Sequence, residues 1–160
     1  RAYTRVRERV GDMLAAGDGG AGLFIDYGFP AREYYLPQRS QGTLMCHYRH
    51  HAHVDPFYLP GLQDITAHVD FTAVAHAALD AQLEVLGYAS QTQFLINCGI
   101  TDVLGEISPG DPAAYLPLVA EAQKLMSPAE MGELFKVIAF ARGLDLPWLG
   151  FARGDKGHTL

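Results

Sequence analysis

Apolar residues follow two different spacings in the first part of this chain. Residues 2–16 have helical spacing, with apolar side chains gathered on one face: Val6, Val10, Met13 and Leu14. The run Leu23-Phe24-Ile25 is continuous instead, and it ends at Asp26-Tyr27-Gly28. A short continuous run is typical of a strand that is buried on both faces of a parallel sheet. The pattern therefore predicts a helix, a glycine-rich turn over 17–22 and then a buried strand.

Helical spacing returns three times further along the chain. It predicts helices over 70–82, 92–98 and 111–126. Gly99 is expected to close the second of them, because glycine readily adopts the left-handed conformation of a helix end. Asp111-Pro112 is a start signal for the third, with Asp as N-cap and Pro at the first helical position.

Two more strands are expected, over 83–88 and 135–140. The motif Ser127-Pro128-Ala129-Glu130 predicts one further helix start, before the strand over 135–140. Residues 29–64 show neither period and are rich in Pro, Gly, His and Tyr, so they predict a long ordered loop or insertion. Strands that alternate with helices indicate an α/β fold. Three strands are too few for a stable parallel sheet, so further strands are expected upstream of Arg1.

Composition excludes several classes of protein. The chain has 160 residues, 49% of them hydrophobic and 19% charged, which is enough apolar material for a packed core. A net charge of −6 without a cluster of Lys and Arg argues against nucleic-acid binding. No apolar run is long enough to span a membrane. The two cysteines, Cys46 and Cys98, lack C-x-x-C spacing, which favours a reducing, intracellular compartment.

The glycines of 17–22 match the spacing of a dinucleotide-binding loop, Gly17-x-Gly19-x-x-Gly22. Such a loop works only after a strand and before a helix. Here it follows a predicted helix and precedes a predicted strand. We therefore interpret it as a surface turn.

Two groups of polar residues are candidates for chemistry. Asp26 ends a predicted strand, where open α/β sheets bind their ligands, although capping of the following loop is an equal alternative. Asp64, Thr66 and His68 are the stronger candidates in the segment 60–71. Asp70 directly precedes a helix and is expected to be its N-cap.

Four of the seven histidines lie in residues 47–53. His51-x-His53-x-Asp55 is similar to the start of the zinc site in metallo-β-lactamase-type hydrolases. That family continues with a histidine, however, and here Pro56 follows. Histidines that face solvent or form hydrogen bonds are the default interpretation, so no metal is expected.

Six stretches, in order, resemble the MidA-like family of S-adenosylmethionine-dependent methyltransferases. They are 24–28, Gly42-Thr43-Leu44 with Tyr48 and His50, 55–56, 60–71, 92–95 and 131–137. The stretch 60–71 is long and specific. The family was formerly classed as a domain of unknown function. It has bacterial and mitochondrial members.

The resemblance implies that this chain is the C-terminal part of a class I, Rossmann-like methyltransferase sheet, with a long loop insertion and extra helices. That sheet is mostly parallel, and this part would end with its antiparallel closing strands. The S-adenosylmethionine-binding half would lie upstream of Arg1, so this part alone is expected to bind the cofactor poorly and to be inactive. Mitochondrial relatives methylate an arginine of a respiratory complex I subunit, so a protein substrate is expected. The localisation would be cytoplasmic in a bacterium and mitochondrial in a eukaryote.

For a guanidinium acceptor, carboxylates would orient the nucleophile and accept a proton. Asp26 and Asp64 are the catalytic candidates, and Tyr27, Thr66 and His68 are the candidates for substrate binding. An assembly factor that binds a partner without turnover is the alternative, and a metal-dependent hydrolase is a more distant one.

Overall fold

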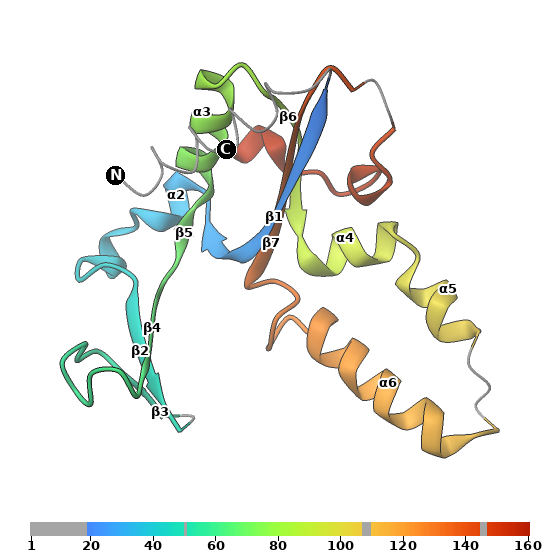
Figure 1. Cartoon of the computed structure of the whole chain (residues 1–160), viewed down its shortest axis with the longest axis horizontal. Helices are drawn as coiled ribbons and strands as arrows, with labels where there is room; N and C mark the ends of the chain where they lie inside the picture. Colours follow the sequence, from blue (N-terminus) through green and yellow to red (C-terminus); the bar gives the residue numbers. More distant parts are fainter. Residues whose placement is uncertain (1–18, 50, 107–109, 145–146) are drawn as a thin grey trace.

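The computed structural model describes residues 19–49, 51–106, 110–144 and 147–160 (Figure 1). The helix expected over 2–16 lies outside these ranges. The elements, in chain order, are β1 (Gly20–Phe29), α2 (Ala31–Tyr34), η1 (Pro37–Arg39), β2 (Leu44–Tyr48), β3 (His51–His53), β4 (Asp64–Ala67), β5 (Val69–Asp70), α3 (Phe71–Asp80), β6 (Glu84–Ser90), α4 (Gln91–Asn97), α5 (Ile100–Gly105), α6 (Pro112–Met126), β7 (Phe135–Arg142), η2 (Leu149–Phe151) and η3 (Gly157–Thr159).

The main sheet has the strand order β5-β1-β7-β6, and β7 is antiparallel to both of its neighbours. The α/β class is confirmed, and β7 is one of the antiparallel closing strands that the resemblance implies. The reason for its direction lies in the return path from β6. Ser90, the last residue of β6, pairs with Lys136 near the start of β7, and the Thr92 amide donates to the Gly132 carbonyl at 3.1 Å. Because β7 begins at the edge where β6 ends, it must run in the opposite direction.

Strand β1 is longer and more exposed than its apolar run predicts. It includes Gly20 and Gly22, so the surface turn expected over 17–22 is wrong for those residues. A Cβ on Gly22 would lie 2.6 Å from the Phe140 ring, so glycine here permits close packing instead of a turn. Burial on both faces is also wrong, because Leu23 and Ile25 are 47% and 49% exposed. Within the described residues, positions 20–27 pair only with β7.

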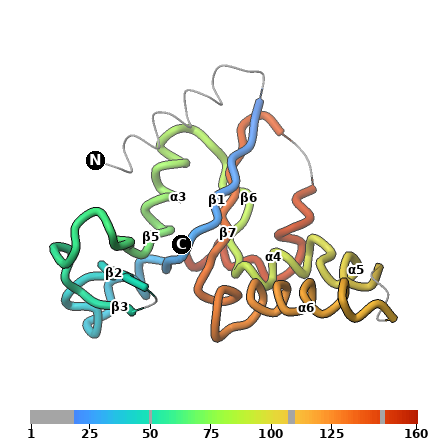
Figure 2. Tube along the Cα trace, turned by 60° about the horizontal axis from the view of Figure 1, so that its bottom comes forward, coloured from blue at the N-terminus to red at the C-terminus, as the bar shows by residue number. Residues whose placement is uncertain are grey.

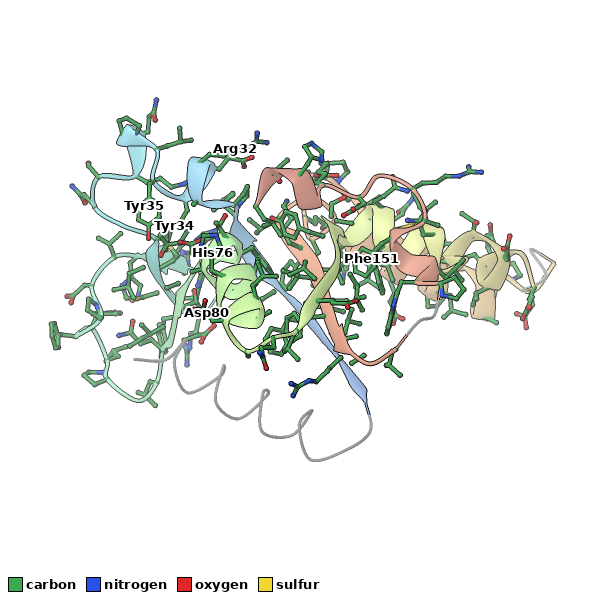
Figure 3. All side chains as sticks on the ribbon, turned by 90° about the horizontal axis from the view of Figure 1, so that it is seen from above. Arg32, Tyr34, Tyr35, His76, Asp80 and Phe151 are labelled. Carbon is green, nitrogen blue, oxygen red and sulfur yellow. The ribbon has the colours of Figure 1, made fainter. Side chains whose placement is uncertain are left out.

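The core has two parts, one on each face of the main sheet. The first joins Phe71, Val74 and Ala78 of α3 to Tyr88, Ile138 and other strand residues. The second joins Val137 and Ala139 to Phe151 of η2. In the view from above, His76 and Asp80 of α3 lie on one side of the sheet and Phe151 lies on the other (Figure 3). Helices therefore cover both faces, as the α/β pattern predicts.

The segment expected as a loop over 29–64 contains regular structure. Strands β2, β3 and β4 form a separate antiparallel sheet in the order β3-β2-β4, which projects from the carboxyl end of β1 (Figure 1). The prediction missed these strands because they are short and their exposed positions interrupt the apolar pattern. Cys46 is the fully buried residue at the centre of β2.

Most of the predicted helix boundaries are confirmed. Asp70 caps α3 by accepting the Ala73 amide at 3.1 Å, and Gly99, which follows the C-cap of α4 at Cys98, is left-handed, with φ +85°. Residues 127–130 form turns, so the expected helix start there is wrong. The Ser127 carbonyl accepts the amides of Glu130 and Gly132, which turns the chain into β7.

Helix α6 projects away from the main sheet together with α5, as a second direction of view also shows (Figure 2). Only Ala122 of its 15 residues is buried. No helix in the described ranges combines the length and apolarity that a bilayer span requires. Because α6 has little tertiary packing, its stability depends strongly on its ends.

We expect Asp111→Ala to fray the start of α6. The Asp111 carboxylate accepts the Ala114 amide at 3.3 Å, and losing an N-cap costs about 1 kcal/mol. Amides in the first turn of α6 should exchange with solvent roughly fivefold faster, as measured by hydrogen-deuterium exchange. Asp111→Asn, which keeps a capping oxygen, is the control and should exchange like the wild type. Equal exchange in all three proteins would contradict the capping role.

Candidate functional site

The carboxyl end of β1 is held against β5 by a close backbone approach at Gly28. A Cβ on Gly28 would lie 2.2 Å from the Val69 carbonyl oxygen and 2.9 Å from the Phe71 ring. The strand does not end at Asp26-Tyr27-Gly28 as the apolar run predicts, since Gly28 lies inside β1 and pairs in parallel with Val69. The chain leaves the strand after Phe29, at Pro30. Gly28 therefore allows two strand ends to meet.

Aromatic side chains gather where these strand ends meet. The ring of Tyr27 contacts His68 and Phe135 edge to face, with centroids 5.5 and 5.4 Å apart. Phe29 stacks on His68, with centroids 4.9 Å apart and an angle of 21° between the rings. The His68 amide donates to the Thr43 hydroxyl at 3.2 Å, which ties this cluster to β2. Tyr27 and His68, both predicted to bind substrate, are thus brought together.

A pocket of about 460 Å³ opens beside this cluster. Its wall includes Phe29, His68, Arg39, Gln41 and Thr43. The Arg39 guanidinium lies 3.9 Å from the centre of the Phe29 ring, at a distance typical of a cation–π contact. The Nδ1 atom of His68 is buried and has no hydrogen-bond partner. Buried polar atoms usually have one, so this atom is an exception among the described residues beside the pocket.

Arg39 and Gln41 were not among the predicted site residues. Arg39 lies in a short 3-10 helix, which no periodic pattern marks. Gln41 directly precedes Gly42-Thr43-Leu44, a stretch that matches the resembled family, and this was the available signal.

Asp26 lies outside this pocket, because neighbouring side chains point to opposite faces of a strand. Its carboxylate is exposed and accepts the Tyr27 amide at 2.8 Å. It lines a smaller cleft of about 280 Å³, together with Ile25, Val69 and Phe71. Asp26 and Tyr27 therefore serve different faces of the same strand end.

Asp64 and Thr66 lie further from the aromatic cluster than their sequence positions suggest. The Thr66 hydroxyl donates to the Met45 carbonyl at 3.2 Å, within the small sheet. Asp64 is exposed at the opposite end of β4 and pairs with His47. Four residues of extended chain place it about 13 Å from His68. The two predicted catalytic carboxylates thus belong to separate parts of the molecule.

The histidine-rich segment is arranged for packing and local hydrogen bonds. His53 packs edge to face against Tyr58, and the Asp55 carboxylate accepts the Phe57 amide at 2.9 Å. Among the described residues, no three His, Cys, Asp or Glu side chains are placed to hold a metal ion together.

Two titratable groups have shifted pKa values near the strand ends. Burial lowers the pKa of the Lys136 ammonium, against the opposing effect of Glu133, and Lys136 pairs with Asp26 across the sheet. Burial, reinforced by Glu33, raises the pKa of the Tyr88 phenol well above its ordinary value. Tyr88 is therefore a neutral core residue, and Lys136 is the shifted group that lies near Asp26.

A family model matches residues 2–89, and it is described as "Putative S-adenosyl-L-methionine-dependent methyltransferase". The match covers β1, the small sheet, α3 and most of β6.

Two named relatives are the mitochondrial protein arginine methyltransferase NDUFAF7 of Danio rerio and that of Homo sapiens. The first is 35% identical over 122 residues, which is 76% of this chain and 27% of that protein. The second is 32% identical over 123 residues, which is 76% of this chain and 26% of that protein. The chain thus spans about a quarter of the length of these relatives.

Two crystal structures of a protein from Burkholderia thailandensis share 60% sequence identity with this chain and superpose with a TM-score of 0.92. They match 98% of this chain, which corresponds to 41% and 40% of the two crystallised chains. The second contains bound S-adenosyl-homocysteine.

Proposed function

The chain belongs to the MidA-like family of S-adenosylmethionine-dependent methyltransferases, and from this premise we propose that it is the C-terminal part of a protein methyltransferase. The proposal rests on the carboxyl end of β1, where a pocket beside His68 and a smaller cleft beside Asp26 open on opposite faces of the strand. Open α/β sheets bind ligands beyond the carboxyl ends of their strands. An arginine side chain is the proposed methyl acceptor, since the relatives from fish and mammals are named protein arginine methyltransferases.

The rest of the sheet is proposed to come from upstream of Arg1. Positions 20–27 of β1 pair on one side only among the described residues, and Leu23 and Ile25 are half exposed. A strand with an unpaired edge and uncovered apolar side chains favours a further strand beside it. The crystallised relatives are more than twice as long as this chain, so they contain enough sequence for such strands.

The cofactor is proposed to be held mainly by that upstream part. In the described residues Gly20 and Gly22 lie inside β1, so they form no phosphate-type loop between a strand and a helix. When bound, S-adenosylmethionine supplies a methyl group that is already activated by its sulfonium. The residues of this chain would then be required to align the acceptor and to receive a proton.

Distinct roles are proposed for the side chains at the end of β1. Tyr27 and His68 would contact another part of the substrate, on the face of β1 that borders the larger pocket, because their rings pack together there. Asp26 would accept the proton released when the acceptor nitrogen is methylated, with the acceptor proposed to enter the smaller cleft that the exposed Asp26 carboxylate lines. Thr66 stays a prediction for substrate contact and Asp64 for catalysis. Both lie along β4, further from the end of β1 than His68.

A second candidate function is an assembly factor that binds a partner without turnover. Exposed apolar side chains of the small-sheet segment favour it, above all Phe57, which is 83% exposed. Large exposed apolar side chains are typical of interaction surfaces when they gather together.

Titration of S-adenosylmethionine into the full-length protein separates these candidates. We expect binding with a Kd of about 1–100 µM, a range typical of enzyme substrates, and transfer of labelled methyl groups to a protein acceptor, located by mass spectrometry. Residues 1–160 alone should bind far more weakly, as isothermal titration calorimetry would show. Equal affinity of this chain and the full-length protein would contradict the proposed division of labour. Binding without transfer would favour the assembly factor.

A further inference from the structure

The charge of the pocket beside Phe29 differs from that of the whole chain. The chain carries a net charge of −6, yet none of the described residues that line this pocket has a carboxylate. Its polar wall consists of Arg39, Gln41, Thr43 and His68, and its apolar part includes Leu44 and Val54. A cationic group would therefore meet the Arg39 charge here without a compensating anion.

Within the described residues, no carboxylate is paired with the Arg39 guanidinium. Its Nη1 atom donates to the main-chain carbonyl of Glu33, and its guanidinium lies over the Phe29 ring. Neither partner is an anion, and the Glu33 carboxylate lies 3.9 Å from Arg32 instead. A guanidinium has five N–H donors in a planar fork that matches a carboxylate. Donors of Arg39 therefore stay available to a group in the pocket.

His68 adds a second polar group on the same wall. Its ring is fixed between Phe29 and Tyr27, and its buried Nδ1 atom has no partner in the described part of the chain. The Gln41 amide also borders the pocket. The polar groups of this wall are best paired by an occupant that accepts hydrogen bonds and carries negative charge.

We propose that this pocket binds a carboxylate of the protein substrate, carried by an acidic residue close to the methylated one. The assignment of this carboxylate to a substrate rests on the proposed function. Arg39 is then a specificity-determining residue, with the guanidinium paired to the carboxylate and His68 contacting the same group. The apolar residues Leu44 and Val54 would contact the methylenes of the acidic side chain.

The experiment uses the full-length protein and pairs of short arginine-containing peptides that differ by one aspartate replaced with asparagine, at each position near the arginine. Fluorescence anisotropy measures their affinities. For at least one position, the aspartate peptide should bind about tenfold more tightly or better, as expected for a hydrogen-bonded charge pair. The preference should weaken as salt is added. Equal affinities at every position, or no binding of either peptide, would overturn the proposal.

Substitutions of Arg39 assign the preference to this pocket. Arg39→Gln should abolish it, Arg39→Lys should keep part of it, and Arg39→Glu should favour a peptide with lysine in place of the aspartate. Arg32→Gln is the matched control, because Arg32 is exposed on α2 and does not line the pocket. Thermal unfolding checks that each variant is folded. If the preference persists in Arg39→Gln and in Arg39→Glu, the assignment to Arg39 is wrong.

The carboxylate could also belong to the methionine part of the cofactor. S-adenosylmethionine affinity is therefore measured on the same proteins. A tenfold loss of cofactor affinity in Arg39→Gln, with no aspartate preference in the wild type, would assign the pocket to the cofactor and overturn the proposal. Aspartate preference without methyl transfer would instead leave the carboxylate site intact and contradict the proposed function.

Discussion

Replacement of Gly28 by alanine is expected to lower the free energy of unfolding by about 3 kcal/mol, the upper part of the range for overpacking a tight site. The added methyl group would lie 2.2 Å from the Val69 carbonyl oxygen and 2.8 Å from the Val69 amide nitrogen. The obstacle is backbone, so no side chain can move away to make room. Strands β1 and β5 would separate, and their separation would weaken the packing of Phe71 against the sheet.

Chemical denaturation of the full-length protein, followed by circular dichroism, measures this effect. Gly105→Ala is the matched control, because a Cβ on Gly105 meets no atom within 4 Å and the residue lies in helix α5. That substitution should be neutral or stabilise by up to about 1 kcal/mol. Equal stability of the Gly28→Ala and Gly105→Ala proteins would show that the strand ends are not closely packed at Gly28.

Asp26→Asn in the full-length enzyme is expected to lower kcat for methyl transfer about 100-fold, the lower end of the contribution of a general base. Asparagine has nearly the same shape and can still accept the Tyr27 amide, so the fold should be unaffected. It cannot take up the proton that an arginine acceptor releases. The affinity for S-adenosylmethionine should therefore stay unchanged while the rate of methyl transfer falls.

The rate is measured by mass spectrometry with saturating cofactor. Glu121→Gln removes an exposed carboxylate from α6, far along the chain from the site, and should leave the rate unchanged. Asp64→Asn tests the second catalytic candidate on the small sheet. If Asp26→Asn and Asp64→Asn both transfer methyl groups at the wild-type rate, neither carboxylate takes part in the chemistry.

Local signals in the sequence predicted much of the secondary structure. Asp70, Gly99 and Asp111 marked helix ends correctly, because a cap depends on one side chain and the few backbone groups next to it. The motif Ser127-Pro128-Ala129-Glu130 failed for the opposite reason. The carbonyl of Ser127 is used by turns that return the chain to the sheet, and pairing between distant strands decides this path.

The candidate site was predictable only in part. Tyr27 and His68 were selected from separate segments, and the fold brings them into contact. Asp64 was selected beside His68 in sequence, but the extended β4 strand carries it to the far end of the small sheet. Arg39 and Gln41 gave no periodic signal, since a pocket wall is assembled from residues whose positions depend on loops and on neighbouring strands.

The sequence by itself determined the α/β class, the caps of its helices and the family resemblance, since each of these is encoded by neighbouring residues or by a short motif. The tertiary structure alone decided that β1 lies between β5 and β7, that Gly28 serves a close strand contact and that Arg39, Phe29 and His68 share one pocket wall. Strand pairing and pocket walls depend on contacts between residues far apart in the chain, which no local pattern encodes.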